Sequence, residues 1–323
     1  MKRIFLLSGE NLELAKAEIL ALSDNHEAQD IESIENIFIL ETDFDFRRLA
    51  LTRKVCNLLF QTTPEKLESD MQSFDWRSIY KKSFSIRITN PNHHPCNFKE
   101  LDLAKYLWRS VEEPKVDLNH SQTKIELIIT KDKILVGHLI AELNHEFNKR
   151  RPSTRPARHP TTINPKIARA VVNLTGIQVG SSLTDPFCGS AGILIEAGLM
   201  RFKPIGFDID PDMIDRARKN LTYYNIKRFQ LEQADSTRLS VPLEYVATDL
   251  PYGMNSKITD NIEKLYADFL KVLEAHLKYN AVLIFPHYVD HKALIKRTRL
   301  KLLAEFNLYV HKSLSRNIVL LKR

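Results

Sequence analysis

The sequence predicts an α/β protein whose C-terminal half is a mostly parallel, Rossmann-like sheet with an antiparallel edge, preceded by an α+β region. Two observations lead to this class. From residue 164 onward, short apolar segments alternate with amphipathic helical segments, which is typical of a parallel sheet covered on both faces. The chain then closes with two consecutive strand-like segments, which indicates an antiparallel hairpin at the edge. With 323 residues the chain is long enough for two or three domains.

The C-terminal half is expected to contain strands and helices in regular order. The helices are recognised by apolar residues recurring every three or four positions and the strands by short apolar runs. The expected helices cover residues 164–174, 192–200, 211–224 and 262–278, followed by a short helix, and the expected strands cover 182–187, 204–209, 229–233, 245–249, 281–286, 302–310 and 318–321.

The N-terminal half shows a less regular order. A break at Thr62-Thr63-Pro64 divides it, and the segments around Lys131-Asp132-Lys133 predict a hairpin. The expected strands cover residues 3–7, 36–40, 84–88, 124–130 and 134–143, and the expected helices cover 11–22, 45–59 and 98–111.

A basic, proline-rich segment without hydrophobic periodicity separates the two halves, which is typical of a linker. With a net charge of +7 the chain favours a polyanionic partner. Such a segment can be merely solvated, but beside an active site it can hold a phosphate backbone. The residues expected to contact RNA are Lys149, Arg150, Arg151, Arg155 and Arg158.

The cysteines and the apolar segments indicate a soluble cytoplasmic protein. Cys56, Cys96 and Cys188 are odd in number and widely spaced, so they predict reduced thiols rather than a disulfide framework or a metal knuckle. His93 and His94 lie in a polar loop with no cluster of partners, and no metal is expected. The apolar run at residues 4–7 is too short for a signal peptide, and no stretch is long enough to span a bilayer.

The first strand of the alternation ends in a turn made of small residues. Asp185 closes the strand, and residues 189–192 are Gly-Ser-Ala-Gly, which lets the backbone approach a ligand closely. The Gly-x-Gly-x-x-Gly pattern of dinucleotide sites is absent. A carboxylate at Asp185 suits the ammonium group of a methionine moiety better than a phosphate. The residues expected here at a cofactor are Asp185, Pro186, Phe187, Gly189 and Gly192.

Acidic residues also end the next two strands. Asp208 is placed to accept hydrogen bonds from the two ribose hydroxyls of a nucleoside, and Ile209 beside it is also expected at the cofactor. Asp210, before Pro211, is expected to cap the following helix. Asp235 and Ser236 follow the third strand and are expected to meet an adenine amino group. Each acid taken alone is as compatible with a loop or a cap, but three in succession favour a nucleoside-binding edge.

The fourth strand ends in Asp249-Leu250-Pro251-Tyr252. The amine of a nucleobase is a weak nucleophile because its lone pair is delocalised into the ring. The Asp249 carboxylate and the Leu250 carbonyl, fixed by the rigid Pro251, can accept the amine hydrogens, and Tyr252 offers a face on which a base stacks. We expect catalysis by positioning and electrostatics. A turn that uses these residue types for ordinary reasons is the alternative.

With these residues in view, the chain resembles the amino-methyltransferases with an Asp/Asn-Pro-Pro-Tyr signature, and in particular the archaeal tRNA guanosine-10 N2-methyltransferase family. The resemblance is carried by residues 185–189, 192–198 and 310–316 and by the Arg-Pro stretch before Asn164. It implies S-adenosylmethionine as cofactor, tRNA as substrate, and transfer of one or two methyl groups to a guanosine N2 amine, with position 10 favoured. Whether a small activator subunit takes part is left open.

The resemblance also implies a domain division. Residues 1–60 would form a small N-terminal α+β domain, 61–147 a THUMP domain that binds RNA and captures the tRNA acceptor end, 148–163 the linker, and 164–323 the methyltransferase domain. Two positions depart from the family pattern: Leu250 stands where Pro is usual, and Ala191 stands where Gly is usual. We expect Ala191 to be tolerated with a negative φ.

Three alternatives remain at this point. The target could be another guanosine in tRNA or rRNA. The signature also fits DNA adenine or cytosine methyltransferases, which would leave the N-terminal half without an explanation. The third is a non-catalytic RNA-binding relative, which Leu250 favours and the acids Asp185, Asp208, Asp235 and Asp249 oppose.

Overall fold

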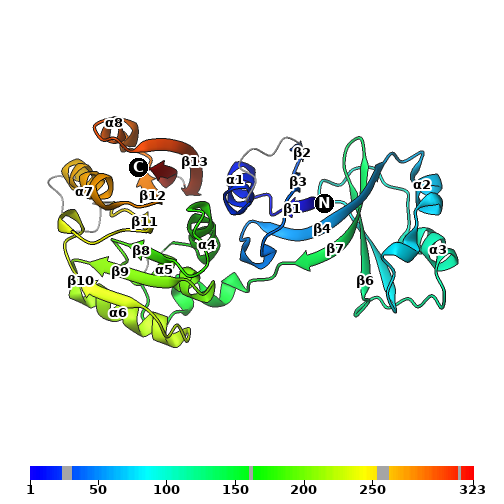
Figure 1. Ribbon diagram of the computed structural model, residues 1–323, viewed down its shortest axis with the longest axis horizontal. Helices are drawn as coiled ribbons and strands as arrows, with labels where there is room; N and C mark the ends of the chain where they lie inside the picture. The colour runs from blue at the N-terminus through cyan, green and yellow to red at the C-terminus, as the bar shows by residue number, and fades with distance from the viewer. Residues whose placement is uncertain (24–30, 160–162, 253–261, 312–313) are drawn as a thin grey trace. The chain divides into compact units, whose positions relative to one another are not determined.

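The computed structural model describes residues 1–23, 31–159, 163–252, 262–311 and 314–323. The chain forms two compact units that are interleaved in sequence. The first consists of Met1–Leu12, Ser23–Arg47 and Thr52–Asn144, and the second of Glu13–Leu22, Arg48–Leu51 and His145–Arg323. Figure 1 shows the two units with their elements labelled.

The first unit is built on a seven-stranded sheet in the order β2-β3-β1-β4-β7-β6-β5. All neighbours are antiparallel except β5 and β6, which run parallel. Two helices pack with this sheet around a core that includes Trp76 and Phe84. The elements are β1 (Lys2–Leu7), β2 (Glu32–Ile34), β3 (Ile37–Glu41), β4 (Thr52–Thr62), α2 (Leu67–Ser73), β5 (Phe84–Thr89), α3 (Glu100–Ser110), β6 (Thr123–Ile129) and β7 (Ile134–Glu142), with 3-10 turns at Phe46–Arg48 and Trp76–Ser78.

The helix expected over residues 45–59 is wrong, because most of that segment is strand β4. β4 pairs with β1 on one side and β7 on the other, so consecutive side chains such as Val55 and Cys56 are both fully buried. Burial on both faces places apolar residues at spacings that also suit a helix, and periodicity alone does not separate the two. Strand β2 and helix α2 were not expected from the sequence.

The second unit contains a seven-stranded sheet in the order β10-β9-β8-β11-β12-β14-β13. The first five strands are parallel, whereas β14 is antiparallel to both β12 and β13, which confirms the Rossmann-like sheet with an antiparallel edge. The strands are β8 (Ser182–Asp185), β9 (Lys203–Asp208), β10 (Gln230–Gln233), β11 (Tyr245–Asp249), β12 (Asn280–Pro286), β13 (Lys301–His311) and β14 (Leu314–Lys322).

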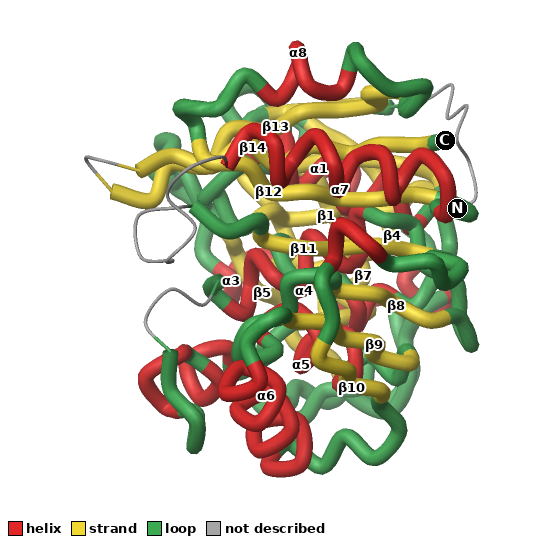
Figure 2. The backbone as a smooth tube through the Cα atoms, turned by 90° about the vertical axis from the view of Figure 1, so that its left-hand side faces the viewer, coloured by secondary structure: helices red, strands yellow, loops and turns green. Residues whose placement is uncertain are grey.

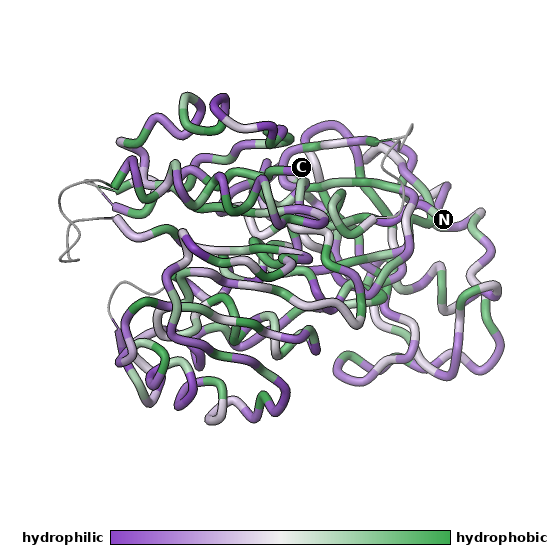
Figure 3. The backbone as a smooth tube through the Cα atoms, turned by 60° about the vertical axis from the view of Figure 1, so that its left-hand side comes forward, coloured by the Kyte–Doolittle hydropathy of each residue, from purple (hydrophilic) through white to green (hydrophobic). Residues whose placement is uncertain are grey.

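Helices cover this second sheet in two groups (Figure 2). α4 (Pro165–Leu174) packs against α5 (Gly192–Leu199) and α5 against α6 (Pro211–Tyr223), while α7 (Ile262–His276) packs against α8 (His291–Ile295). Apolar side chains of α7, such as Phe269, join a core with Leu283 of β12, and α5 and α6 form a separate core around Leu194 and Leu221. Figure 3 shows hydrophobic residues gathered along the strands between the helices.

Helix α1 (Leu12–Leu22) belongs almost entirely to the second unit, although it lies near the start of the chain. Its Glu18 is fully buried. The two carboxylate oxygens accept hydrogen bonds from the backbone N–H groups of Ala50 (2.8 Å) and Leu51 (2.9 Å) and from Asn173 Nδ2 of α4 (2.7 Å). Burial raises the pKa of Glu18, and these donors oppose that rise. One carboxylate therefore fastens an N-terminal helix to the C-terminal fold.

Helices able to cross a lipid bilayer are absent from the described part of the chain.

Replacing Glu18 with Ala is expected to destabilise the second unit by about 3 kcal/mol, because three buried donors lose their acceptor and each unsatisfied group costs about 1–3 kcal/mol. Thermal or urea unfolding measures the change. Glu13→Ala on the same helix is the matched control, since the Glu13 side chain is 75% exposed and pairs with Lys16. Equal stability of the two variants would contradict the anchoring role of Glu18.

Candidate functional site

The carboxyl ends of parallel strands gather the acids that the sequence singled out. Asp185 ends β8, Asp208 ends β9 and Asp249 ends β11. The charges of Asp249 and Asp208 both act on Asp185. Because neighbouring parallel strands end at one edge of the sheet, these three carboxyl groups form one acidic cluster there.

Asp185 is the most deeply placed member of this cluster, with 2% of its surface exposed. Its Oδ1 accepts hydrogen bonds from Thr248 Oγ1 (2.6 Å) and from the Phe187 N–H (3.2 Å). Burial raises the pKa of Asp185 to about 7, and the nearby Asp249 and Asp208 contribute to the rise. The group therefore exchanges a proton near neutral pH, and a cation bound beside it would favour the ionised form.

Two residues in the turn after β8 have a left-handed backbone conformation. Gly189 has a φ of +47° and donates its N–H to Asp208 Oδ2 (2.8 Å), which ties the first loop to the second strand. Ala191 has a φ of +68°, so the negative φ under which alanine was expected to be tolerated here is not adopted. The left-handed conformation costs a non-glycine residue about 1–2 kcal/mol. The Ala191 methyl group is fully buried in the apolar cluster around Leu194, which offsets part of that cost.

Asp208 and its neighbours form the second part of the edge. Besides Gly189, the Asp208 carboxylate accepts the Asp210 N–H at Oδ1 (3.0 Å), and burial raises the pKa of Asp208. Asp210 caps α6 by accepting the Asp212 N–H (2.9 Å), which confirms the expected cap. Ile209 leaves 59% of its surface exposed between these polar groups. If Asp208 binds the ribose of a nucleoside, the exposed Ile209 side chain beside it can pack against the face of the base.

The third loop is occupied by local contacts. Asp235 Oδ1 accepts hydrogen bonds from the Thr237 N–H (2.9 Å) and Oγ1 (2.7 Å), and its other oxygen lies 3.4 Å from Arg238. The Ser236 hydroxyl is buried and donates to the Pro186 carbonyl. Asp235 thus caps the turn at Ser236–Arg238, while Ser236 links the third loop to the first.

The backbone after β11 is held by two tyrosine hydroxyl groups. Tyr266 of α7 donates to the Pro251 carbonyl, and Tyr288 donates to the Tyr252 carbonyl. The Leu250 N–H donates to the Ile284 carbonyl of β12 (3.1 Å). Within the described residues the Leu250 carbonyl has no hydrogen-bond partner, so it remains the free acceptor of the turn. Gly253, which follows, lies outside the described residues.

Leu250, which departs from the family pattern, has a structural role. Its side chain is 2% exposed and packs in the core shared by α7 and the strands. A proline here would lack the N–H that bonds to Ile284. The leucine therefore fixes the turn through burial and a hydrogen bond, where a proline would fix it through its ring.

Arg316 of β14 is a site residue that sequence reasoning did not assign. Its Nη2 lies 3.4 Å from Asp249 Oδ2, and its guanidinium lies 5.4 Å from the centre of the Tyr252 ring. The Tyr252 hydroxyl donates to Asp249 Oδ1. Arg316 ends the segment 310–316 that carries the family resemblance, which was the available signal. Tyr266 and Tyr288 gave no comparable signal.

The basic segment between the halves divides into buried and exposed residues. Arg150 pairs with the fully buried Glu196 of α5 (2.7 Å), and Arg155, 2% exposed, donates from Nε to the Arg150 carbonyl (3.1 Å). The Arg150 guanidinium therefore anchors the segment to α5, and the Arg155 guanidinium is buried with it. Lys149, Arg151 and Arg158 are exposed, and only these three present their charge to solvent.

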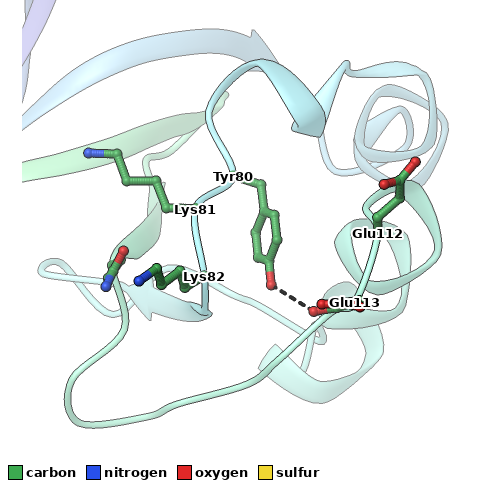
Figure 4. A pocket seen from close by; sticks show the side chains of 6 residues that line it. Tyr80, Lys81, Lys82, Glu112 and Glu113 are labelled. Atoms are coloured by element: carbon green, nitrogen blue, oxygen red, sulfur yellow. Dashed lines mark hydrogen bonds between the residues drawn. The ribbon is translucent and has the colours of Figure 1, made fainter.

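A hollow of about 480 Å³ lies in the first unit (Figure 4). The Tyr80 hydroxyl crosses it and donates to the Glu113 carbonyl (3.1 Å). Its lining carries both signs of charge and comes from Tyr80, Lys81, Lys82, Glu112, Glu113 and Gln122. The residues singled out by the sequence are not among its lining. Among the described residues there is also no group of three or more His, Cys, Asp or Glu side chains that could hold a metal ion.

Comparison with known proteins agrees with this geometry. Residues 152–316 match the family model described as RMKL-like, methyltransferase domain. A tRNA (guanine(10)-N2)-dimethyltransferase of Methanothermobacter thermautotrophicus is 31% identical over 340 residues, which cover 100% of both chains. One of Pyrococcus abyssi is 30% identical over 318 residues, covering 94% of each. The crystal structure of TrmN from Thermus thermophilus superposes with a TM-score of 0.53 at 18% identity, over 100% of both chains, and so shares the fold.

A mostly parallel sheet with carboxylates at its strand ends, followed by the Asp-Leu-Pro-Tyr turn, defines an S-adenosylmethionine-dependent methyltransferase. Full-length identity above 30% is more specific than the fold. The chain belongs to the tRNA (guanine(10)-N2)-dimethyltransferase family.

The residues at the sheet edge are compatible with this cofactor. S-adenosylmethionine carries a positive charge on its ammonium and sulfonium groups, a ribose diol and an adenine ring. At this edge a partner is available for each group: the buried Asp185 carboxyl for the ammonium, the Asp208 carboxylate for the diol, and the exposed Ile209 side chain for the adenine ring. A Cβ atom placed on Gly189 would meet no other atom within 4 Å, so the space on that side of the glycine is open.

The raised pKa of Asp185 predicts a pH-dependent stability for the cofactor-free protein. The folded state keeps a proton on Asp185 up to about pH 7, whereas an unfolded aspartate loses it near its ordinary value of 3.8. Stability is therefore expected to fall as pH rises from about 4 to about 7, by up to roughly 4 kcal/mol. Asp185→Asn removes this dependence, so the variant gains stability relative to the wild type at pH 8 compared with pH 5.

Thermal unfolding of both proteins at these two pH values checks this expectation. Asp212→Asn is the control, because its carboxylate is 61% exposed. A difference between Asp185→Asn and wild type that does not change with pH would contradict a shifted Asp185.

Proposed function

We propose that this protein transfers one or two methyl groups from S-adenosylmethionine to the N2 amine of a guanosine in tRNA, with guanosine 10 favoured. The observation that carries the proposal is the pair of acceptors after β11, formed by the Asp249 carboxylate and the Leu250 carbonyl. The carbonyls of Pro251 and Tyr252 are already bonded to tyrosine hydroxyls. An amine with two hydrogens is the group that such a pair recognises.

The reaction requires that the protein position the target amine; it does not require a strong base. Asp249 Oδ1 and the Leu250 carbonyl accept the two amine hydrogens, which draws the nitrogen lone pair out of conjugation with the ring. The cofactor supplies an electrophilic methyl group bound to sulfonium sulfur. The amine would lose one proton on methylation, and Asp249, whose pKa burial raises, is placed to accept it. Tyr252 supplies an aromatic face for the base.

The cofactor roles follow the strand ends. Asp185 would hold the ammonium group, Asp208 the ribose hydroxyls, Ile209 one face of the adenine, and Asp235 with Ser236 the adenine amino group. The backbone of Pro186, Phe187, Gly189 and Gly192 would line the methionine side. Burial, charge and exposure support the roles of Asp185, Asp208 and Ile209, whereas Asp235 and Ser236 would have to exchange their present local hydrogen bonds for the adenine amino group.

Position 10 is preferred over other guanosines because the relatives that align over 100% and 94% of the chain are named for it. Their names also specify dimethylation. After a first transfer the N2 amine keeps one hydrogen, and either acceptor can hold it while the lone pair is again presented. The same site can therefore support a second transfer.

The exposed cations Lys149, Arg151 and Arg158 are proposed to hold the tRNA backbone, and residues 61–147 to act as an RNA-binding THUMP domain. The cytoplasm is the proposed compartment, supported by three free thiols at Cys56, Cys96 and Cys188. A small activator subunit remains a prediction from the family resemblance.

Replacing Asp249 with Ala is expected to lower kcat by at least about 1000-fold, because the acceptor that orients the amine is lost. The Kd for S-adenosylmethionine should change by less than about threefold, since Asp249 does not hold the cofactor. Mass-spectrometric nucleoside analysis of an unmodified tRNA transcript measures turnover, and calorimetry measures the cofactor affinity.

Asp249→Asn is the matched variant, because the amide retains an acceptor oxygen and should keep measurable activity. A transcript carrying inosine at position 10 lacks the N2 amine and should give no product. Full turnover by Asp249→Ala, or methylation of the inosine transcript, would refute the assignment.

Charge reversal at Arg151 and Arg158 is expected to raise the KM for tRNA by about tenfold and to reduce the salt dependence of binding by about one unit of slope per lost phosphate contact. kcat at saturating tRNA should be unchanged. Arg323→Glu, an exposed cation at the C-terminus, is the control. Binding that keeps the wild-type salt slope in the Arg151 and Arg158 variants would exclude this segment from the RNA interface.

A further inference from the structure

Arg316 stands beside the amine-binding turn because of strand register. It lies near the start of β14, opposite Pro286 of β12. β12 in turn pairs with β11 so that Ile284 faces Asp249. Arg316 is thus two residues beyond the level of Asp249, past the carboxyl edge of the sheet. From there its side chain, 10% exposed, reaches back to the Asp249 carboxylate.

The side chains of Arg316, Asp249 and Tyr252 all contact one another at this point. The Arg316 guanidinium meets Asp249 at Oδ2, Tyr252 donates its hydroxyl to Oδ1 of the same carboxylate, and the guanidinium lies over the Tyr252 ring. The two carboxylate oxygens therefore have different partners, and one face of the ring is covered by a cation. A base can stack only on the other face.

Stability alone does not explain this placement. The Arg316 Nε is buried and has no hydrogen-bond partner within the described residues. An unsatisfied buried donor costs about 1–3 kcal/mol, and a buried ion pair is often replaceable by neutral residues without loss of stability. The contact with Asp249, at 3.4 Å, is longer than an optimal charged hydrogen bond. The position of Arg316 therefore suggests a role in the reaction.

We propose that Arg316 is a positioning residue of the transfer site, which holds Asp249 by Oδ2 and backs one face of Tyr252, so that Oδ1 and the opposite ring face are presented to the target base. The proposal rests on the function proposed above. Before a base arrives, the Tyr252 hydroxyl occupies Oδ1, and the incoming amine takes its place. Arg316 keeps the carboxylate from turning during this exchange.

The charges around Asp249 give Arg316 a second effect. Asp185 faces the cluster from β8, Tyr252 comes from the turn itself, and Tyr266 comes from α7. Burial raises the pKa of Asp249, and Arg316 is the cation that opposes this rise. Losing Arg316 would therefore keep Asp249 protonated up to a higher pH, and a protonated Asp249 accepts the amine hydrogen less well.

Arg316→Gln and Arg316→Lys, compared with wild type, test the proposal. For Arg316→Gln, kcat at pH 7 is expected to fall by about 100-fold, the loss typical of a reacting group misplaced by about 1 Å. The acidic limb of the kcat–pH profile should move to higher pH, so the deficit shrinks toward pH 9. The Kd for S-adenosylmethionine and the melting temperature should stay near their wild-type values.

Arg316→Lys keeps the charge but loses the planar fork. We expect a loss of about tenfold with the acidic limb at its wild-type position. In an Asp249→Asn background no carboxylate remains at position 249, so Arg316→Gln should cause no shift of the limb. Lys322→Gln, at the exposed far end of the same strand, is the control and should behave as wild type.

An unchanged kcat and an unchanged pH profile in Arg316→Gln would overturn the proposal. So would a rate loss of equal size in both variants together with a lowered melting temperature, which a merely structural role would produce. If Arg316→Gln does not fold, the Lys variant decides by its rate and profile. Asp249→Ala is measured in parallel: its full turnover would defeat the proposed function, whereas its inactivity beside a wild-type-like Arg316→Gln would defeat this inference alone.

Discussion

Three carboxyl groups converge at one edge of a parallel sheet, and the surrounding structure limits the repulsion among them. Asp185 receives the Thr248 hydroxyl from the neighbouring strand, and Asp208 receives two backbone N–H groups. The Asp249 carboxylate forms an ion pair with Arg316 and accepts a hydrogen bond from the Tyr252 hydroxyl. The three acids thus interact with different partners, although each lies at the end of a parallel strand of the same sheet. Asp185 is left with a pKa of about 7, which makes it the member most responsive to a bound cation.

Different partners allow different roles within a small volume. A carboxyl group that exchanges its proton near neutrality is suited to a cationic ligand, since binding shifts it to the charged form. A carboxylate held by an arginine keeps its acceptor oxygens oriented. Among the described residues the Leu250 carbonyl has no hydrogen-bond partner, whereas the two carbonyls that follow it accept from Tyr266 and Tyr288. Selection of one backbone acceptor therefore depends on residues outside the signature.

The catalytic unit is assembled from separate parts of the chain. α1 and residues Arg48–Leu51 join it through Glu18, whose buried carboxylate bonds to Asn173 of α4. The basic segment joins it through Arg150, which shares Glu196 of α5 with Arg169. α5 begins directly after the left-handed Ala191 of the first loop. The cofactor-type loop is thus supported by residues that a sequence-based boundary would assign to other domains.

The sequence alone determined the alternation of strands and helices in the second unit, the antiparallel edge, and the placing of Asp185, Asp208 and Asp249 at strand ends. These features depend on the periodic spacing of apolar residues and on short turns, and both are specified by residues that are consecutive in the sequence. The proposed amine-binding signature was also visible, because its four residues are adjacent in the chain.

Only the tertiary structure decided the rest. β4 is a strand because β1 and β7 flank it, although its apolar spacing also suits a helix. Arg150 and Arg155 are anchors rather than surface cations because Glu196 and the fold enclose them. Arg316 reaches Asp249 through the register of β11, β12 and β14. Each of these outcomes depends on contacts between residues far apart in sequence, and no local pattern specifies which distant side chain will satisfy a buried charge.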